Sequence, residues 1–534
     1  MHPTVFIGLD GATFTILDPL VAEGAMPFLK AFMERGVRAT LLSTPNPLTP
    51  PAWTSMMTGR NPGSHGVFDF IWAEERPSDH YFTLYNFRDI QCETVWSIAS
   101  RQQGKICSLN FPLMAPAPAV NGYIVPGLVN WKHLRRYVYP KDIYDRIKAL
   151  PGFNAKEIAW DFDLEKEASR GIPPEKYQEW IEFHIRRERQ WFEIVRFFLQ
   201  EHPCDLTGIL FDGPDKMLHI GWRFLDPAFY SQEPTPWEEK IRGLILSYFR
   251  ELDGFIERIA ELAGPQARIV MGSDHGFGPG RLIFRVNTWL HEQGYLTWKD
   301  LGPLDPKAAE SVRRLVERHF VLLDWEKTTA YARTSTSNGI YIRKAKGPGH
   351  TGVPAEQYES FRSELKNKLA AITDPVSGER IIKHIYTKEE AYPGENNEQA
   401  PDLTMVFYDH SFASILNKEP MIYHHHETLG THYPEGVFLA AGPGIRSGVS
   451  LPALSIVDVA PTLLHSLGLE IPADFEGQLP AEAFEAGFLE QFPVTIGPAT
   501  QRPNAYLDEK KPEALNAEEE EEIYKQMKAL GYVE

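Results

Sequence analysis

Aspartates follow three hydrophobic segments of this chain. They are Asp10 after the run 4–9, Asp212 and Asp215 after the run 206–211, and Asp274 after the run 267–271. In an open α/β sheet the carboxyl ends of parallel strands face one crevice, so these carboxylates are expected to converge. His219 and His275 lie close to two of them in the sequence. Carboxylate oxygens and imidazole nitrogens are common ligands of divalent metal ions, and the pattern therefore predicts a metal site.

The spacing of these acids and histidines suits two ions. Asp215 and His219 are at positions i and i+4, which places both on one face of a helical turn. Asp274 and His275 are adjacent at a strand exit, and a second ion is expected there together with Asp10. Each pair by itself is also compatible with a capping acid or a surface histidine. Their joint occurrence at strand ends favours metal binding.

The segment 49–59 offers a nucleophile. Thr49 is expected to be the N-cap of a helix, with Pro50 at the first helical position and Gly59 at its end. A hydroxyl at a helix amino terminus faces backbone N–H groups and the positive end of the helix dipole, which also suits a phosphate. A nearby metal ion lowers the pKa of such a hydroxyl and favours its alkoxide. The alternative is that Thr49 is only a cap.

Alternating strands and helices are expected to position these residues. Residues 4–9 predict a strand, 26–35 a helix and 37–42 a second strand, an opening that indicates an α/β fold with a mostly parallel central sheet flanked by helices. Further predicted strands are 105–110, 122–125, 206–211, 267–271 and 436–441, and further predicted helices are 173–200, 237–262 and one that opens near Pro461.

The pattern of elements predicts a discontinuous core with inserted segments. Residues 1–301 and 423–480 are interpreted as the α/β catalytic core, with a helical insertion at about 140–200. Residues 302–422 mix helices and strands and are interpreted as an α+β insertion or cap. Residues 481–534 are interpreted as a C-terminal extension, in which the glutamates after Asn516 open an acidic helix that ends at Gly531.

Composition limits the class of partner. The chain has 534 residues, of which 43% are hydrophobic and 24% charged, and these are ordinary values for a globular protein. The formal net charge of −18 argues against binding of a nucleic-acid duplex, because such binding normally needs a basic face. It is compatible with a small phosphorylated substrate held by metal ions. No particular oligomeric state is indicated.

Cysteine usage and the amino terminus favour a reduced compartment. Cys92, Cys107 and Cys204 are an odd number without C-x-x-C spacing, so free thiols are expected rather than disulfides or a cysteine metal site. No leader-like segment precedes the first strand, and no run of about 18 apolar residues offers a transmembrane segment. The expected localisation is cytoplasmic.

Several short motifs together resemble one known family. They occur in the family's order as Gly8-Leu9-Asp10-Gly11, the segment 49–59 followed by Pro62 and His65-Gly66, Pro126-Gly127, Pro214-Asp215 with His219, Ser273-Asp274-His275-Gly276, Gly430-Thr431-His432, and Gly442-Pro443-Gly444. The series resembles the alkaline phosphatase superfamily, most closely its type I phosphodiesterase/nucleotide pyrophosphatase branch. The resemblance implies an alkaline-phosphatase-like core with cap segments.

The resemblance also implies a reaction and its residues. It implies two metal ions, usually zinc, although sites of carboxylate and histidine also accept manganese or iron. The reaction implied is hydrolysis of a phosphate ester through a phosphothreonine on Thr49. By position, one ion would be held by Asp10, Thr49, Asp274 and His275, and the other by Asp215, His219 and His432.

One position departs from the family pattern. Nucleotide pyrophosphatase-like enzymes carry an asparagine shortly after the His-Gly pair, where it donates to a phosphate oxygen, whereas this chain has Asp69. An ionised Asp69 would repel an anion, which puts cleavage of nucleotide diesters in question. A second ambiguity concerns the histidines 424–426, which compete with His432 for the metal; the glycines that follow His432 favour the latter.

Four functions are compared on these residues. A hydrolase of phosphate diesters or monoesters leads, with the diester slightly ahead. A phosphomutase would use the same site and return the phosphoryl group to a substrate oxygen. A sulfatase is disfavoured, because that branch uses a modified Cys or Ser in another motif. A non-catalytic sensor of phosphate ligands is disfavoured because no ligand or nucleophile is missing.

Overall fold

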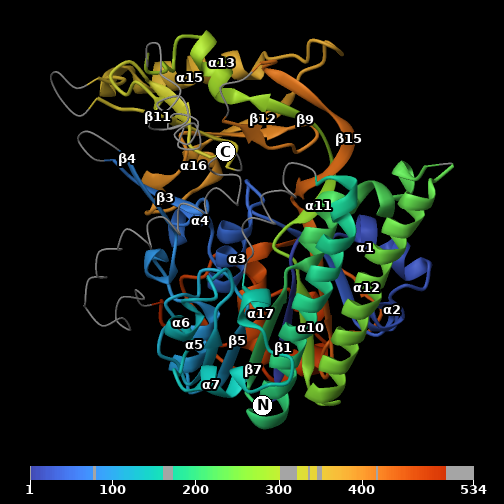
Figure 1. Ribbon diagram of the computed structural model, residues 1–534. Coiled ribbons are helices and arrows are strands. Elements are labelled where there is room, and N and C mark those ends of the chain that lie inside the picture. The colour runs from blue at the N-terminus through green and yellow to red at the C-terminus, as the bar shows by residue number, and fades with distance from the viewer. Residues whose placement is uncertain are drawn as a thin grey trace.

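The protein consists of an α/β core below a smaller cap (Figure 1). The computed structural model describes residues 2–75, 80–159, 172–231, 233–300, 322–334, 337–345, 351–415 and 419–500. The acidic helix predicted after Asn516 and the turn predicted at 346–349 lie outside these residues. Within the described ranges, no helix combines the length and the apolar character that a bilayer crossing needs.

A nine-stranded sheet forms the centre of the core. Across the sheet the order is β17 (Val449–Ser450), β2 (Val37–Leu42), β16 (Glu435–Ala441), β8 (Arg268–Gly272), β1 (Thr4–Leu9), β7 (Leu206–Phe211), β5 (Ile106–Leu109) and β6 (Gly122–Val125), and β18 (Leu454–Ser455) pairs with β2. The pairings are parallel except for the two that β16 makes with β2 and β8. The predicted fold class, α/β with a mostly parallel sheet, is confirmed.

Helices bury both faces of the sheet, which explains the unbroken apolar runs of the central strands. One face packs against α1 (Phe14–Ala22), α2 (Pro27–Glu34), α10 (Tyr177–Glu201), α11 (Gly213–Leu225) and α12 (Pro236–Ala263). The other face packs against α3 (Thr49–Thr58), α5 (Val95–Arg101) and α17 (Val459–Ser466). All six residues of β1 and of β7 are buried.

The cap has a hydrophobic core of its own. An antiparallel sheet in the order β10 (Ala330–Ala332), β11 (Gly339–Ile342), β13 (Leu403–Phe407) and β12 (Ile382–Thr387) packs with α13 (Val286–Glu292) and α15 (Tyr358–Ala370). A second sheet has the order β14 (Ala413–Ser414), β9 (Gly276–Arg285) and β15 (Ile422–Tyr433). Because β9 and β15 leave the core at one end and enter the cap at the other, they form a ribbon between the two parts (Figure 1).

Shorter elements complete the periphery. They are α4 (Pro62–His65), the hairpin β3 (Ile71–Glu75) and β4 (His80–Leu84), the helices α6 (Leu134–Tyr137), α7 (Ile143–Lys148), α8 (Ala155–Ile158), α16 (Lys388–Ala391) and α18 (Ala486–Gln491), and the paired β19 (Ile471–Pro472) and β20 (Ile496–Gly497). Seven short 3-10 helices are also described, at 87–89, 174–176, 227–229, 355–357, 397–399, 456–458 and 481–483.

Candidate metal centre

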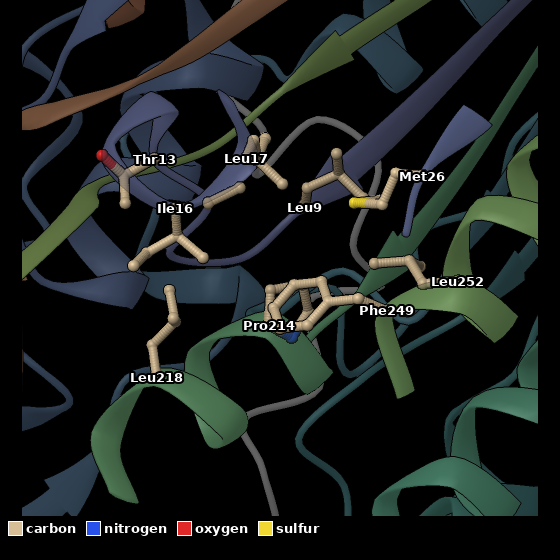
Figure 2. A pocket seen from close by; sticks show the side chains of 10 residues that line it. Leu9, Thr13, Ile16, Leu17, Met26, Pro214, Leu218, Phe249 and Leu252 are labelled. Carbon is tan, nitrogen blue, oxygen red and sulfur yellow. The ribbon is translucent and has the colours of Figure 1, made fainter. Parts of the chain in front are cut away.

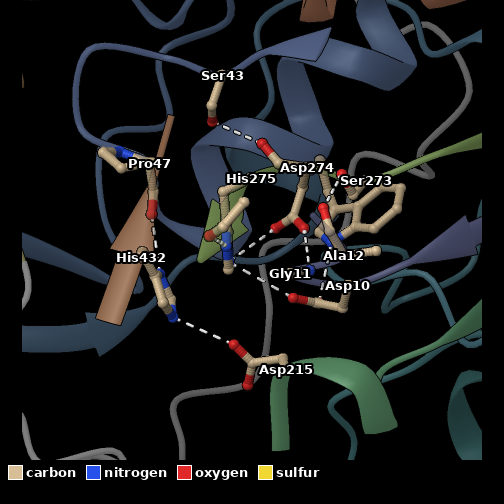
Figure 3. Close-up of polar contacts among 12 residues, drawn as sticks. Asp10, Gly11, Ala12, Ser43, Pro47, Asp215, Ser273, Asp274, His275 and His432 are labelled. Atoms are coloured by element: carbon tan, nitrogen blue, oxygen red, sulfur yellow. Dashed lines mark hydrogen bonds and ion pairs between the residues drawn. The ribbon is translucent and has the colours of Figure 1, made fainter. Parts of the chain in front are cut away.

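The strand ends meet as the sequence predicts. Asp10 follows β1, Asp212 follows β7, and Asp274 lies two residues after β8, and these three strands are neighbours in the parallel part of the sheet. Strand β16 runs the opposite way, so its start lies at the same edge and brings the preceding His432 there. Distant parts of the chain therefore supply one group of side chains (Figure 3).

One set of ligand atoms comes from Asp10, Asp274 and His275, called set A here. The Nε2 atom of His275 lies 3.5 Å from Asp10 Oδ1 and 3.4 Å from Asp274 Oδ2. All three residues are buried, and one potential ligand atom of each lies within 4.8 Å of the others. The backbone N–H of Gly11 donates to Asp274 Oδ1 over 3.3 Å, which orients this carboxylate.

The other set comes from Asp215, His219 and His432, called set B here. The Oδ1 atom of Asp215 lies 3.1 Å from His432 Nε2 and 3.4 Å from His219 Nε2. The two Nε2 atoms are 3.2 Å apart. Asp215 and His219 share one face of α11, as their spacing predicts. Sets A and B are in contact, because the rings of His275 and His432 stack with centroids 3.7 Å apart.

Each histidine is held through its other nitrogen. In each ring the Nδ1 atom contacts a backbone carbonyl oxygen. His219 contacts Gly430 at 3.2 Å, His275 contacts Gly276 at 3.1 Å, and His432 contacts Pro47 at 2.9 Å. A neutral ring that donates from Nδ1 leaves the lone pair of Nε2 free to face the centre. Metal-binding histidines are commonly oriented by a contact of this kind.

The buried polar atoms of the centre test whether a cation fits. Four atoms have no hydrogen-bond partner although they are buried, namely Asp10 Oδ1, Asp274 Oδ2, His275 Nε2 and Asp215 Oδ1. Buried polar atoms are nearly always satisfied, and each exception needs an explanation. Three of these atoms belong to set A and one to set B, and in set B the Nε2 atoms of His219 and His432 contact each other. A divalent cation in each set would satisfy them, so the residues present fit a metal centre.

Burial perturbs the acids and bases of the centre. Burial and the neighbouring carboxylates raise the pKa of Asp10 and of Asp274 well above the usual value. Burial also lowers the pKa of His275 and of His432, which favours neutral imidazoles as metal ligands need. Burial alone would raise the pKa of Asp215, but Lys216 and the two histidines outweigh it and hold that pKa well below its usual value.

Helix α3 places Thr49 beside the centre. The residue is half-buried and opens the helix, but Leu48 and not Thr49 is the N-cap, so the predicted capping role is wrong by one position. Two contacts bracket Thr49. The Pro47 carbonyl contacts His432, and the Trp53 Nε1–H donates to Asp10 Oδ2 over 3.1 Å. The segment 47–53, which includes the start of α3, is thereby tied to both sets.

Three residues that the sequence analysis did not single out as site residues support the ligands. The Oγ–H of Ser43 donates to the Asp274 carbonyl over 2.6 Å, and Trp53 contacts Asp10. Lys216 is buried and its ammonium contacts Asp215 Oδ2 at 3.0 Å, so it is a salt-bridge partner and not a surface charge. Only Lys216 carries a sequence signal, because it directly follows a predicted ligand.

Asp69 turns toward the cap. Its Oδ2 accepts from the Thr334 hydroxyl over 2.6 Å and its Oδ1 accepts from the Phe70 N–H over 2.7 Å. Burial raises the pKa of Asp69 to about 6, against which the hydrogen bonds and Arg333 act. With both oxygens engaged as acceptors, Asp69 is not arranged to donate a hydrogen bond to a phosphate.

The histidine run on β15 is separate from the centre. His424 forms an ion pair with Asp374 at 2.9 Å in the cap, and His424 and His426 are exposed. His432 lies at the core end of the same strand, within reach of Asp215.

An apolar cavity of about 10 Å³ lies between β1, α1, α11 and α12 (Figure 2). Its lining includes residues that directly precede site residues, namely Leu9, Pro214 and Leu218. The remaining lining is almost entirely apolar, and the volume is about that of one water molecule. This cavity is therefore too small for a phosphorylated substrate.

The chain thus has a mixed α/β fold with two candidate sets of metal ligands at one edge of its central sheet. The family model of type I phosphodiesterase / nucleotide pyrophosphatase matches residues 4–434, and the chain belongs to this family. The expected class of enzyme, a hydrolase acting on phosphoric ester bonds, is thereby confirmed. Comparison with curated protein sequences gave no significant match.

Solved structures with the same fold include enzymes of two kinds. One is murine ectonucleotide pyrophosphatase / phosphodiesterase 5, as an inactive variant in complex with AMP, with 13% sequence identity and a TM-score of 0.52. The superposed region covers 91% of this chain and 100% of the murine chain. The human protein of that name is 14% identical with a TM-score of 0.51 and the same coverage. Phosphonoacetate hydrolase from Sinorhizobium meliloti, in complex with phosphonoformate, is 17% identical with a TM-score of 0.51, and covers 87% of this chain and 96% of its own.

Proposed function

We propose that the protein hydrolyses phosphate esters at a two-metal site through a phosphothreonine on Thr49. The observation that carries the proposal is the convergence of two ligand sets, in which three facing atoms of set A and the facing Asp215 oxygen of set B lack hydrogen bonds. Set A together with Thr49 would hold one ion, and set B the other. Zinc is the proposed metal, since Asp and His ligands in threes suit a catalytic zinc site, and manganese and iron are the alternatives.

The proposed reaction has two steps, and Thr49 takes part in both. When bound, the two ions would lower the pKa of the Thr49 hydroxyl and offset the negative charge that develops on the phosphoryl and leaving oxygens. The Thr49 Oγ attacks phosphorus and gives up its proton to solvent. The bond from phosphorus to the ester oxygen breaks, and that oxygen leaves with the electron pair and takes up a proton from solvent, so that phosphorus is bound to Thr49 Oγ. A water molecule then attacks phosphorus in line and loses a proton, the bond to Thr49 Oγ breaks, Oγ takes up a proton, and phosphate or a phosphate monoester is released.

The protein contributes mainly orientation and a dry surrounding. The carbonyls of Pro47, Gly276 and Gly430 fix the three imidazoles. Trp53 and the Gly11 N–H fix the carboxylates of set A. Preorganised groups of this kind need little rearrangement in the transition state, which is the largest contribution to catalysis in phosphoryl transfer.

Asp69 bears on the choice between ester classes. A diester carries one negative charge at the phosphorus and a monoester up to two, and Asp69 offers neither of them a donor. Diester cleavage therefore needs another donor or relies on the metals alone. We retain the diester as the first substrate class and the monoester as the second.

A rate comparison tests the proposal. The purified protein, loaded with Zn2+ and with Mn2+ in turn, is assayed on an aryl phosphate diester, an aryl phosphate monoester and an aryl sulfate, and bound metal is quantified on the same sample. We expect two ions per chain and metal-dependent release of phenol from a phosphate ester. Faster cleavage of the sulfate, or full activity after complete removal of metal, would overturn the proposal.

A further inference from the structure

Helix α10 buries charged side chains that the proposed reaction does not use. Arg187 and Glu188 are each 1% exposed, on a helix face that is otherwise largely aromatic and aliphatic. Burying a charge is costly unless the group is paired and hydrogen-bonded, so charges in such a place need a reason. The long helix is packed along α11 and α12 (Figure 1).

These side chains hold the first turn of α11. The guanidinium of Arg187 pairs with Asp212 Oδ2 at 2.8 Å, and the backbone N–H of Gly213 donates to Glu188 Oε1 over 2.6 Å. A third contact from α10 is the Trp180 Nε1–H, which donates to the Lys216 carbonyl over 3.3 Å. The three contacts lie on both sides of Asp215 in the sequence.

The packing at Gly213 leaves little room for the helix start to move. A Cβ atom at this position would lie 2.6 Å from Glu188 Oε1 and 2.2 Å from the Tyr248 hydroxyl, so only glycine fits without displacement. The backbone of Gly213 therefore packs closely against Glu188 of α10 and Tyr248 of α12. The first N–H groups of a helix have no partner within the helix itself. Glu188 supplies the acceptor for the Gly213 N–H.

The first turn of α11 carries ligands of set B alone. Asp215 presents Oδ1 to the histidines while Lys216 contacts Oδ2. His219 follows one turn later on the same face. A displacement of this helix start would move both ligands together, whereas Asp10, Asp274 and His275 of set A are carried by β1 and by the exit of β8.

We propose that Glu188 is a positioning residue for set B, and that through the Gly213 N–H it sets the metal affinity of this set without affecting set A. The inference rests on the proposed function only in that both sets bind divalent ions. Groups that orient metal ligands typically contribute about 10- to 100-fold in metal affinity.

Two variants separate position from charge. Glu188→Gln keeps the length of the side chain and an oxygen acceptor but cannot ionise, whereas Glu188→Asp keeps the carboxyl group and withdraws the acceptor by one methylene. Zn2+ affinity is measured by competition with a chromophoric chelator. Set B is isolated in an Asp274→Ala background and set A in a His432→Ala background. Glu193→Asp, on the exposed side of the same helix, is the matched control, and its side chain is 39% exposed.

We expect Glu188→Asp to weaken Zn2+ binding by set B about 10- to 100-fold, with less than about 3-fold change for set A. Glu188→Gln and Glu193→Asp should change neither set by more than about 3-fold, and circular dichroism should show all variants folded. The opposite order, with Asp tolerated and Gln impaired, would mean that Glu188 serves only to balance the charge of Arg187.

Other outcomes overturn the inference in distinguishable ways. Equal loss in both sets would indicate a general structural role for Glu188. Unchanged affinity in every Glu188 variant, with two ions bound by the unmodified protein, would remove the positioning role but leave the proposed function intact. Failure of the unmodified protein to bind Zn2+ or Mn2+ would overturn the two-metal proposal together with this one.

Discussion

At the scale of single residues, the centre is organised by contacts around the proposed ligands. Each imidazole has one nitrogen on a backbone carbonyl and the other facing a carboxylate. The arrangement gives Thr49 a role distinct from that of the carboxylates, because α3 and not a strand end delivers it. Variants of these residues should therefore separate turnover from metal binding.

Replacement of Thr49 by alanine should abolish turnover while the metal content stays near two ions per chain. The hydroxyl is the proposed nucleophile, and loss of a nucleophile commonly lowers kcat by a factor on the order of 10³ or more. Hydrolysis of an aryl phosphate ester and metal analysis of the same preparation check both parts. Thr54→Ala is a matched control on the same helix, since its hydroxyl donates to the Pro50 carbonyl over 2.7 Å. Undiminished activity in Thr49→Ala would remove the residue from its assigned role.

Loss of a set B ligand should release about one ion per chain and leave the other bound. His432→Ala and Asp215→Ala both remove a group whose partners lie within 3.4 Å. Set A keeps its three ligands in these variants. Metal analysis after dialysis checks the expectation, with His424→Ala as a control because His424 pairs with Asp374 outside the centre. Two ions retained in both ligand variants would contradict the division into sets.

At the scale of elements, the core and the cap meet where Asp69 accepts from Thr334. The segment after α4 carries Asp69, and the segment after β10 carries Arg333 and Thr334. The Arg333 guanidinium lies 3.7 Å from the centroid of the Tyr341 ring within the same contact region. A titratable group in this buried position links the stability of the contact to pH.

Asp69 should make the protein less stable as the pH rises from about 4 to about 6. Burial raises the pKa of Asp69 from 3.8 to about 6, so the folded protein keeps a proton that the unfolded chain has already lost. The stabilisation is full below the lower pKa and is lost as the pH passes the higher one, with an upper limit of about 3 kcal/mol. Asp69→Asn should flatten this dependence.

Urea unfolding of both proteins between about pH 4 and pH 7 checks this expectation. Asp89 titrates in the same range, with a pKa raised to about 6 by burial, but it is present in both proteins and its contribution cancels. Parallel stability profiles for the two proteins would contradict the expectation, because they would show that folding does not raise the pKa of Asp69.

Much of the core was predictable from local sequence signals. The strands β1, β2, β6 and β7 have the predicted bounds. For β1 and β7 the reason is a largely apolar, fully buried run bounded by turns, which is a strong local signal. Side-chain partners across the molecule were not predictable. The pairing of Asp69 with Thr334 and of Glu188 with Gly213 joins residues 265 and 25 positions apart, and Glu188 lies within a helix whose pattern indicates only an apolar core face.

In the candidate site, too, local features were predictable from the sequence and contacts between distant residues were not. The aspartates at strand ends and the i, i+4 pair on α11 follow from local pattern and sheet topology. The contact of Trp53 with Asp10, by contrast, depends on how α3 packs over the sheet. The N-cap of α3 was misplaced by one residue, since Leu48 has extended backbone and the helix already begins at Thr49.

At the scale of the whole molecule, the centre concentrates negative charge inside the core. Asp10, Asp215 and Asp274 are at most 4% exposed and lie within one small region. Buried carboxylates that approach one another destabilise the folded state unless a cation or a proton compensates them. Bound metal should therefore stabilise the entire core.

Removal of metal by a chelator should lower the melting temperature by several degrees. Binding at about 1,000 times the dissociation constant contributes roughly 4 kcal/mol for one site, and both sets contribute. Differential scanning calorimetry with and without the chelator checks the expectation, and re-addition of Zn2+ should restore the transition. The combined variant Asp274→Ala with His432→Ala should not respond to the chelator. An unchanged transition in the unmodified protein would argue against metal in the core.

The ribbon of β9 and β15 has a mechanical consequence. His275 directly precedes β9 and His432 lies on β15 opposite Phe277, while at the far end Phe284 and Ile422 pair inside the hydrophobic core of the cap. One proposed ligand of each set is thus attached to the core end of the same two-stranded ribbon, whose other end lies in the cap. A displacement of the cap would therefore move one proposed ligand of each set together, because the paired backbone of β9 and β15 joins them.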